Sequence, residues 1–344
     1  MYDETLEHFF LIYPLIYHVK DAIFYIMDLA KRILAGDVRT ASKLMRDLDD
    51  RLPAARDVLK ELYPKTGKAY IIGITGPPGS GKSTIVDKMT DVFRKEGKTI
   101  GIIAVDPTSP FSGGAILGDR IRMQSHATDE GVFIRSIATR GRLGGLSRST
   151  QDIVNVMDAM GKEIILVETV GVGQDEVDII DTAHTSIVIL IPGMGDDIQT
   201  IKAGLIEIGE LFVVNKCDLE GAEKTAHNLR ALLEMGGKKE DGWKPFIVKT
   251  EAISGKGISE LVKGVYCHKQ AVEKSNVFEK KRKERMKKIF IGILESELIA
   301  HFAGKIEKEL NWDGIIDNLV NRNIDPYTEA ERVIFEVLGI RTLI

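Results

Sequence analysis

Residues 71–89 of the chain read IIGITGPPGSGKSTIVDKM. An apolar run leads into residues 76–81, of which all but one are glycine or proline, and a helical pattern follows. Residues 76–83 read G-x-x-x-x-G-K-S between a predicted strand and a predicted helix, which is the context of a phosphate-binding loop. Backbone N–H groups freed by the glycines, together with the helix N-terminus, attract phosphate oxygens. The stretch therefore predicts a nucleoside triphosphate site.

Each side chain of this loop has an expected role. Lys82 would bridge the β- and γ-phosphates, the Ser83 hydroxyl would bind Mg²⁺, and Thr84 would reach the α-phosphate. The alternative, a glycine-rich turn with an incidental lysine, fits poorly with the complete spacing and both flanks. The predicted phosphate-binding residues are Gly76, Pro77, Pro78, Gly79, Ser80, Gly81, Lys82, Ser83 and Thr84.

The base is predicted by VVNKCDL, residues 213–219. Guanine presents two adjacent donors, N1–H and the 2-amino group, which a carboxylate binds as a two-pronged acceptor. Adenine has an acceptor at N1, so the same carboxylate would face a lone pair. Asp218 therefore selects GTP over ATP, while Asn215 and Lys216 brace the base and the loop. An N-K-x-D alone is weak evidence, but it is strong behind a phosphate-binding loop in strand order.

Two carboxylates are expected near the phosphates. Glu168 ends one apolar run in VETVG, where the backbone N–H of Gly171 would approach the γ-phosphate, and Asp106 ends another in AVDPTSP. Both runs would finish at the carboxyl edge of a parallel sheet, where ligands bind in open α/β folds. Metal or water positioning is the functional interpretation. The alternative is that either side chain caps the following helix.

Slow intrinsic hydrolysis is expected. In small signalling GTPases a glutamine orients the attacking water, whereas Val172 follows Gly171 here and Gln174 lies further on. Acceleration would then depend on a partner or a rearranged loop. The arginines that could stabilise charge, each more commonly structural or solvated, are Arg120, Arg122, Arg135, Arg140 and Arg142.

Bulk composition restricts the partners. The 344-residue chain has a net charge of −4 and a pI of about 6.0, which gives no global electrostatic case for binding nucleic acid or an anionic membrane. Cys217 and Cys267 form no metal-binding or disulfide pattern, so a cytoplasmic location is expected. The apolar N-terminus is interrupted by charged residues, so no membrane span is predicted, and Met27 is an alternative start.

The fold class predicted is α/β, with a mostly parallel P-loop NTPase sheet covered by helices. Continuous apolar runs typical of strands buried on both faces alternate with helical patterns. The runs are 69–75, 99–106, 131–137, 163–169, 186–192, 210–216 and 245–253. The expected domains are an N-terminal helical extension (1–66), a GTPase domain (67–265) and a C-terminal helical extension (266–344).

Taken together, these motifs resemble those of the MeaB/ArgK-type GTPases that accompany adenosylcobalamin-dependent methylmalonyl-CoA mutase. The resemblance runs from about Leu29 to the C-terminus. It is most specific where V-D-P-T-S-P is combined with G-D-R-I-R-M, which separates the chain from Ras-like and nickel-insertion GTPases. The stretches that carry it are GITGPPGSGKST, AVDPTSPFSGGAILGDRIRM, IRSIATRGRLGGLS, VETVGVGQDEVDI, PGMGDDIQTIKAG and VVNKCDL.

The resemblance implies a GTPase that gates delivery of cobalamin to a mutase and protects that mutase from inactivation. It implies that Asp106, Asp119 and Glu168 surround Mg²⁺ with Ser83, and that the C-terminal extension builds a homodimer. The segments implied to respond to nucleotide exchange, or to signal to the mutase, are 136–141, 171–176 and 192–204. For 192–204 a plain glycine-rich connection is the alternative.

One departure and several alternatives remain open. The loop near the guanine O6, which reads S-A-x in the family, reads Glu251, Ala252 and Ile253 here, so only the backbone contact from Ala252 is expected to survive. A phosphotransferase of the ArgK type would use Asp106 or Asp119 as its base. A metallochaperone GTPase would need a Cys or His cluster, and a nucleotide-dependent scaffold would need no useful hydrolysis.

Overall fold

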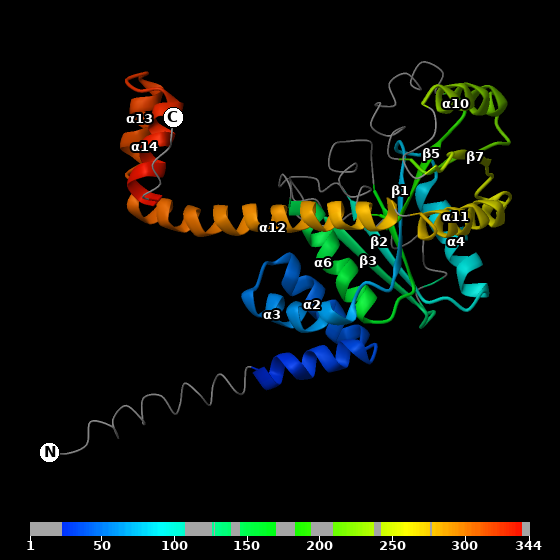
Figure 1. Ribbon diagram of the computed structural model, residues 1–344, viewed down its shortest axis with the longest axis horizontal. Coiled ribbons are helices and arrows are strands. Elements are labelled where there is room, and N and C mark those ends of the chain that lie inside the picture. The colour runs from blue at the N-terminus through cyan, green and yellow to red at the C-terminus, as the bar shows by residue number, and fades with distance from the viewer. Residues whose placement is uncertain are drawn as a thin grey trace. The chain divides into compact units, whose positions relative to one another are not determined.

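Figure 1 shows the computed structural model of the chain. It describes residues 23–106, 126, 128–138, 145–169, 183–193, 209–236, 242–275 and 277–338. The chain divides into two compact units, Met1–Arg282 and Lys283–Ile344, which are described separately below.

The first unit is built on a seven-stranded sheet in which every described pairing is parallel. The strand order is β3-β2-β4-β1-β5-β6-β7. Strands β2, β3 and β4 lie on one side of β1, and the later strands β5, β6 and β7 lie on its other side. The strand order therefore reverses beside β1. Ligands of open α/β sheets bind at such a reversal. The strands are β1 (Tyr70–Thr75), β2 (Ile100–Asp106), β3 (Val132–Ala138), β4 (Ile164–Glu168), β5 (Thr185–Leu190), β6 (Leu211–Val214) and β7 (Phe246–Lys249).

Helices cover both faces of the sheet (Figure 1). One face packs against α4 and α11, which contribute side chains such as Phe93 and Leu261 to its core. The other face carries the N-terminal helices with α6 at one side and α10 at the other. These helices are residues 23–34, α2 (Val38–Asp49), α3 (Pro53–Leu62), the 3₁₀ turn η1 (Tyr63–Lys65), α4 (Lys82–Lys95), α6 (Gly145–Ala159), α10 (Ala222–Gly236) and α11 (Ile258–Glu273).

Burial on both faces explains the continuous apolar runs. Every residue of β4, β5 and β6 is buried, because helices stand on each side of these strands. Alternate residues of one strand enter different cores: in β4, Ile165 and Val167 pack toward the N-terminal helices, whereas Ile164 and Leu166 pack toward α4.

Polar contacts fasten the N-terminal helices to the sheet. The buried Asp158 carboxylate at the end of α6 accepts hydrogen bonds from the backbone N–H groups of Gly67, Lys68 and Ala69, just before β1. Arg135 of β3 donates to Asp49 of α2 at 2.9 Å. The bonds to Asp158 hold the segment that leads into β1, and the bond to Asp49 holds α2 on the sheet.

The second unit contains most of α12 (Val277–Glu309), together with α13 (Trp312–Val320) and α14 (Pro326–Leu338). Asp325 caps α14 by accepting from the N–H groups of Tyr327 and Thr328, and Pro326 begins the helix. The described helices of the chain include none that is long and apolar enough to cross a membrane.

The α/β fold class, the seven strands and the helical flanks are confirmed, with one boundary corrected. The run at 245–253 was predicted as one strand, but β7 ends at Lys249. The chain turns there because Thr250 and the residues after it form a loop closed by the Glu251–Lys256 bridge. The domain boundaries at residues 66 and 265 stay predictions.

Candidate nucleotide-binding site

Three positions in the loop between β1 and α4 have a backbone conformation that only glycine tolerates well. Gly76, Gly79 and Gly81 have φ angles of 149°, 74° and 90°. A Cβ on Gly76 would overlap with the carbonyl oxygen of Ile189, and one on Gly81 would overlap with the Asn215 side-chain amide. Gly81 is also the N-cap of α4 and offers no side chain to cap its N–H groups. Those N–H groups are therefore available to an anion.

The Lys82 side chain folds back over the loop. Its ammonium donates to the carbonyl oxygens of Gly76 at 2.8 Å and Pro77 at 3.0 Å, and the residue is only 6% exposed. A buried ammonium is costly unless it is hydrogen-bonded, and these two carbonyl oxygens satisfy it. The positive charge of Lys82 is thereby held over the loop. This charge lies beside the backbone that is predicted to hold phosphates.

Ser83 and Glu168 meet behind the loop. The Ser83 hydroxyl donates to the Glu168 Oε1 atom at 2.6 Å, across 85 residues of sequence, and both residues are buried. They meet because β1 and β4 are neighbours that end at the same edge of the sheet, with Ile74 opposite Glu168. A hydroxyl and a carboxylate together are hard oxygen ligands of the kind that Mg²⁺ prefers, so this donor set fits the ion.

Asn215 connects three loops. Its Nδ2 atom donates to the Ser80 carbonyl oxygen at 2.8 Å. Its Oδ1 atom accepts from the Thr250 hydroxyl at 3.0 Å and from the Ala252 N–H at 3.1 Å. The residue is 2% exposed, so these bonds are protected from water. One side chain thus joins the phosphate-binding loop, the end of β6 and the loop after β7.

The predicted base-reading residues lie around Asn215. Lys216 has a φ of 56°, a left-handed conformation that turns the chain sharply after β6. The N–H of Cys217 donates to the Thr250 carbonyl oxygen at 3.0 Å, which ties this turn to the next loop. Asp218 is exposed and Ala252 is buried. The carboxylate is therefore open to a ligand while its supporting backbone is fixed.

Part of the predicted site lies outside the described residues. Asp119 and Gly171 fall there, as does segment 171–176. The segments 136–141 and 192–204 are described only at 136–138 and 192–193. Asp106 is described only as the last residue of β2.

Three loop residues have positions that fit their predicted roles less directly. Thr84 lies in the first turn of α4, Glu251 is half-buried in the bridge to Lys256, and Ile253 is 88% exposed. Of the five arginines weighed as charge stabilisers, Arg135 is paired with Asp49 on α2, which supports a structural role for it. The other four lie outside the described residues.

Several residues that support the site are not indicated by the sequence motifs. Thr250 bonds Asn215 directly, and the Thr169 hydroxyl donates to that of Thr75 at 3.1 Å where β1 and β4 end. A threonine at the end of β1 and directly after β4 and β7 was the available signal. It is a weak one, because threonine is common in strands.

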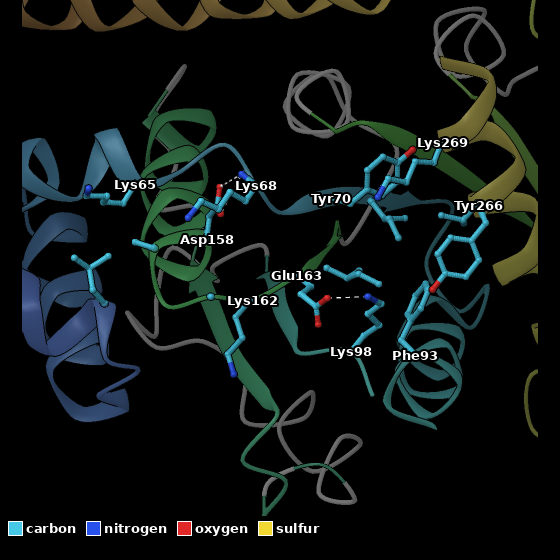
Figure 2. Close-up of a pocket in the computed structure, with 16 residues that line it drawn as sticks. Lys65, Lys68, Tyr70, Phe93, Lys98, Asp158, Lys162, Glu163, Tyr266 and Lys269 are labelled. Atoms are coloured by element: carbon cyan, nitrogen blue, oxygen red, sulfur yellow. Dashed lines mark hydrogen bonds and ion pairs between the residues drawn. The ribbon is translucent and has the colours of Figure 1, made fainter. Parts of the chain in front are cut away.

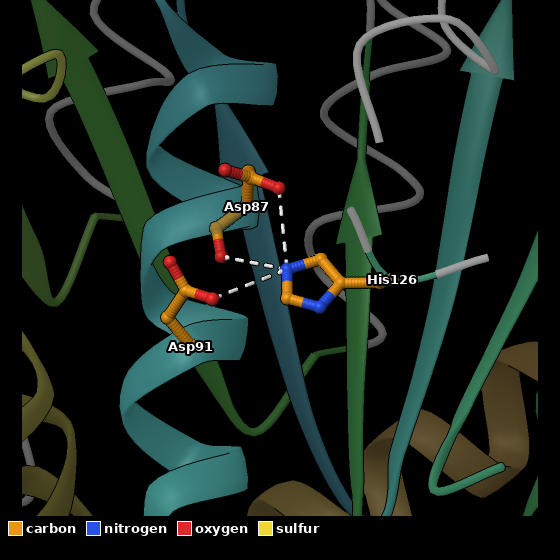
Figure 3. Close-up of side chains that lie close together, drawn as sticks. All are labelled: Asp87, Asp91 and His126. Carbon is orange, nitrogen blue, oxygen red and sulfur yellow. Dashed lines mark hydrogen bonds and ion pairs between the residues drawn. The ribbon is translucent and has the colours of Figure 1, made fainter. Parts of the chain in front are cut away.

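A second cluster lies beside α4, where Asp87 and Asp91 face His126 (Figure 3). The buried His126 Nε2 atom is 3.2 Å from a carboxylate oxygen of Asp87 and 3.6 Å from one of Asp91. Ligand atoms of these three residues lie within 4.8 Å of one another. The Lys88 ammonium, however, already pairs with both carboxylates at 3.1 and 3.3 Å. The cluster is therefore satisfied as an ion-pair network.

The phosphate-binding loop, the Ser83–Glu168 pair and the N-K-x-D turn define a P-loop nucleotide-binding protein of the GTPase class. Within that class, the chain belongs to the MeaB family: residues 42–307 match the model of the methylmalonyl Co-A mutase-associated GTPase MeaB.

Named relatives agree with this assignment. A GTPase of Pyrococcus abyssi is 47% identical over 317 residues, which cover 91% of this chain and 97% of that protein. GTPase ArgK of Escherichia coli is 31% identical over 305 residues, or 87% of this chain and 92% of that protein. The crystal structure of an LAO/AO transport system kinase has a similar fold, with a TM-score of 0.67 at 24% identity over 90% of this chain and 96% of that one.

Close packing between Gly81 and Asn215 can be tested with a matched glycine. Gly81→Ala places a Cβ against the Asn215 amide, whereas Gly79→Ala has a similar φ and no atom within 4 Å of the new Cβ. Both pay about 1–2 kcal/mol of left-handed strain, so Gly81→Ala should lower the free energy of unfolding further than Gly79→Ala. Urea denaturation of nucleotide-free protein measures the difference. Equal losses of unfolding free energy in the two variants would show that the packing is unimportant. An excess loss in Gly81→Ala that persists when Asn215→Ala is added would show the same.

Proposed function

We propose that this GTPase controls cofactor delivery to an adenosylcobalamin-dependent acyl-CoA mutase, and that the site described above is where GTP is bound and hydrolysed. The chain's membership of the mutase-associated MeaB family supports the client. The main support for the site is the set of hydrogen bonds made by the Asn215 side chain, which hold the phosphate-binding loop and the base-reading loops together.

The chain's own residues supply most of the binding chemistry. The N–H groups at the start of α4 and the Lys82 ammonium would surround the phosphates, and Lys82 would exchange its carbonyl partners for phosphate oxygens. During in-line attack of water on the γ-phosphate, negative charge spreads over the equatorial oxygens. The backbone N–H groups at the start of α4 are fixed, so they can stabilise this charge without reorganisation and thereby lower the barrier.

Magnesium is the proposed metal. Ser83 and Glu168 would hold it, with Asp106 and Asp119 as further ligands implied by the resemblance. When bound, the ion would neutralise charge on the phosphates. The hydrogen bond from Ser83 to Glu168 orients the hydroxyl oxygen and carboxylate toward one another in advance, so little side-chain rearrangement is needed.

Changing the guanine-reading carboxylate should change the base. In Asp218→Asn, the side chain offers one acceptor and one donor, which matches xanthine, whose position 2 carries a carbonyl in place of an amino group. We expect the preference for GDP over xanthosine diphosphate to reverse, with a change in the affinity ratio of at least about 100-fold, because a mismatched base leaves polar groups unpaired where it contacts the side chain. Calorimetric titration of both nucleotides measures it.

Glu220→Gln, on the exposed part of the same loop, is the matched control and should bind as the wild type does. An Asp218→Asn variant that still prefers GDP would contradict the assignment of the base site.

The client is tested by GTP turnover of the purified protein, alone and with a cobalamin-dependent acyl-CoA mutase. Slow turnover that rises several-fold with the mutase is expected, because Val172 stands where small GTPases carry the water-orienting glutamine. Lys82→Ala should abolish turnover in both conditions. Turnover indifferent to the mutase would contradict the client but not the GTPase, and γ-phosphate transfer to an acceptor other than water would favour a phosphotransferase.

We also propose a homodimer formed through the C-terminal unit. Its described helices expose large apolar side chains, among them Phe290 at 61%, Ile299 at 68% and Val320 at 73%. Exposed apolar surface of this kind marks an interaction surface, and the resemblance assigns a second copy to it. Sedimentation velocity should show a dimer that Ile299→Glu dissociates, whereas Glu295→Gln on the same helix should leave it intact. A wild-type monomer at micromolar concentration would contradict the proposal.

A further inference from the structure

The histidine of the cluster beside α4 is surrounded by oxygen atoms (Figure 3). The His126 Nε2 atom lies 3.2 Å from a carboxylate oxygen of Asp87, 3.3 Å from the carbonyl oxygen of the same residue and 3.6 Å from a carboxylate oxygen of Asp91. All three distances exceed the value of about 2.9–3.0 Å that is typical of an N–H···O hydrogen bond. A single N–H group cannot point at three acceptors, so a proton on this nitrogen is held only by long contacts.

The same three side chains have the spacing of ligands around one metal ion. Bonds from zinc to histidine nitrogen and aspartate oxygen are about 2.0–2.2 Å long, so two ligand atoms of a tetrahedral site stand about 3.4 Å apart. The separations of 3.2 and 3.6 Å between Nε2 and the two carboxylates lie on either side of that value. All three ligand atoms lie within 4.8 Å of one another. Small side-chain rotations would therefore bring them around an ion.

The backbone positions the three ligands in advance. Asp87 and Asp91 are four residues apart on α4 and so share one face of the helix. His126 precedes β3, and its carbonyl oxygen accepts from the N–H of Asp129 at 3.1 Å. The Arg94 guanidinium of α4 donates to both carboxylate oxygens of Asp129 at 2.7 and 2.8 Å. The histidine is thus brought to the helix by contacts that do not involve the cluster.

Charge and exposure also suit a divalent cation. Two carboxylates and one neutral imidazole balance an ion of charge 2+, and nitrogen with oxygen ligands is a set that zinc accepts. The His126 side chain is only 7% exposed, whereas that of Asp91 is 39% exposed. An ion could therefore enter from solvent on the Asp91 side. Three protein ligands leave the fourth position of a tetrahedral site to water.

The Lys88 ammonium would compete with such an ion. It pairs with Asp87 at 3.1 Å and with Asp91 at 3.3 Å, and its side chain is 32% exposed, so it can turn into water because partly exposed ion pairs are weak. An ordinary pair looks different. In Figure 2, Lys98 and Glu163 are 2.8 Å apart, and none of the side chains drawn around them is a histidine. A histidine that faces both carboxylates therefore distinguishes the cluster beside α4 from a plain ion pair.

We propose that Asp87, Asp91 and His126 form a binding site for a divalent metal ion of the zinc type, which displaces Lys88 when it binds. The site shares no ligand with the magnesium site proposed above and does not depend on the proposed function. Because two ligands come from α4 and the third comes from the segment before β3, a bound ion would fasten this segment to the helix that begins at the phosphate-binding loop.

Zinc is the probe for this site. Isothermal titration calorimetry follows Zn²⁺ binding to the full chain saturated with GDP and Mg²⁺, so that the nucleotide site is already filled. The variants are Asp91→Asn, His126→Gln and Lys88→Gln, and the GDP affinity of each shows that it is folded. Asp57→Asn is the matched control, because Asp57 pairs with Lys60 at the same three-residue spacing on another helix.

Saturable zinc binding is expected, with a dissociation constant at least about tenfold higher in Asp91→Asn and His126→Gln and unchanged in Asp57→Asn. Removal of the competing ammonium should have the opposite effect, so Lys88→Gln should bind zinc at least about threefold more tightly than the wild type. Equal zinc affinity of the wild type and folded Asp91→Asn would overturn the proposal, because the ion would then lie elsewhere. A Lys88→Gln protein that binds zinc no more tightly than the wild type would also overturn it.

Discussion

The hydrogen bonds of the Asn215 side chain are the constraint on which the candidate site depends. The phosphate-binding loop, the turn after β6 and the loop after β7 come from distant parts of the sequence, and this one amide bonds two of them to the third. Because the group is buried, each bond that is lost leaves a polar atom without water, at a cost of about 1–3 kcal/mol. Gly81 is required where the amide approaches the backbone most closely.

The sheet order explains why these loops meet at all. β1 lies between β4 and β5, and β6 lies beyond β5. All four strands are parallel, so Ser83, Glu168 and Asn215 come to the same edge of the sheet from different crossovers. Helices on both faces bury these strands and fix their register. The geometry of the site is therefore a consequence of the apolar runs that make the strands.

Much of this could be predicted from the sequence, because the signals are local. The phosphate-binding loop and N-K-x-D are short motifs, and continuous apolar runs indicate strands buried on both faces. The contacts that complete the site are not local: Asn215 and Ser80 are 135 residues apart, and Asp158 holds a segment 91 residues away. No spacing in one sequence encodes such pairs. The end of β7 was placed too late because Ala252 and Ile253 are apolar although they lie in a loop.

The role of Asn215 is tested by the affinity of the Asn215→Ala variant for GDP. Calorimetry measures it beside the Asn228→Ala variant, which changes a half-buried asparagine of α10. If Asn215 holds the phosphate-binding and base-reading loops in register, its loss should weaken GDP binding by at least about tenfold, the equivalent of one buried hydrogen bond, while Asn228→Ala binds normally. Wild-type affinity for GDP in a folded Asn215→Ala protein would contradict the account.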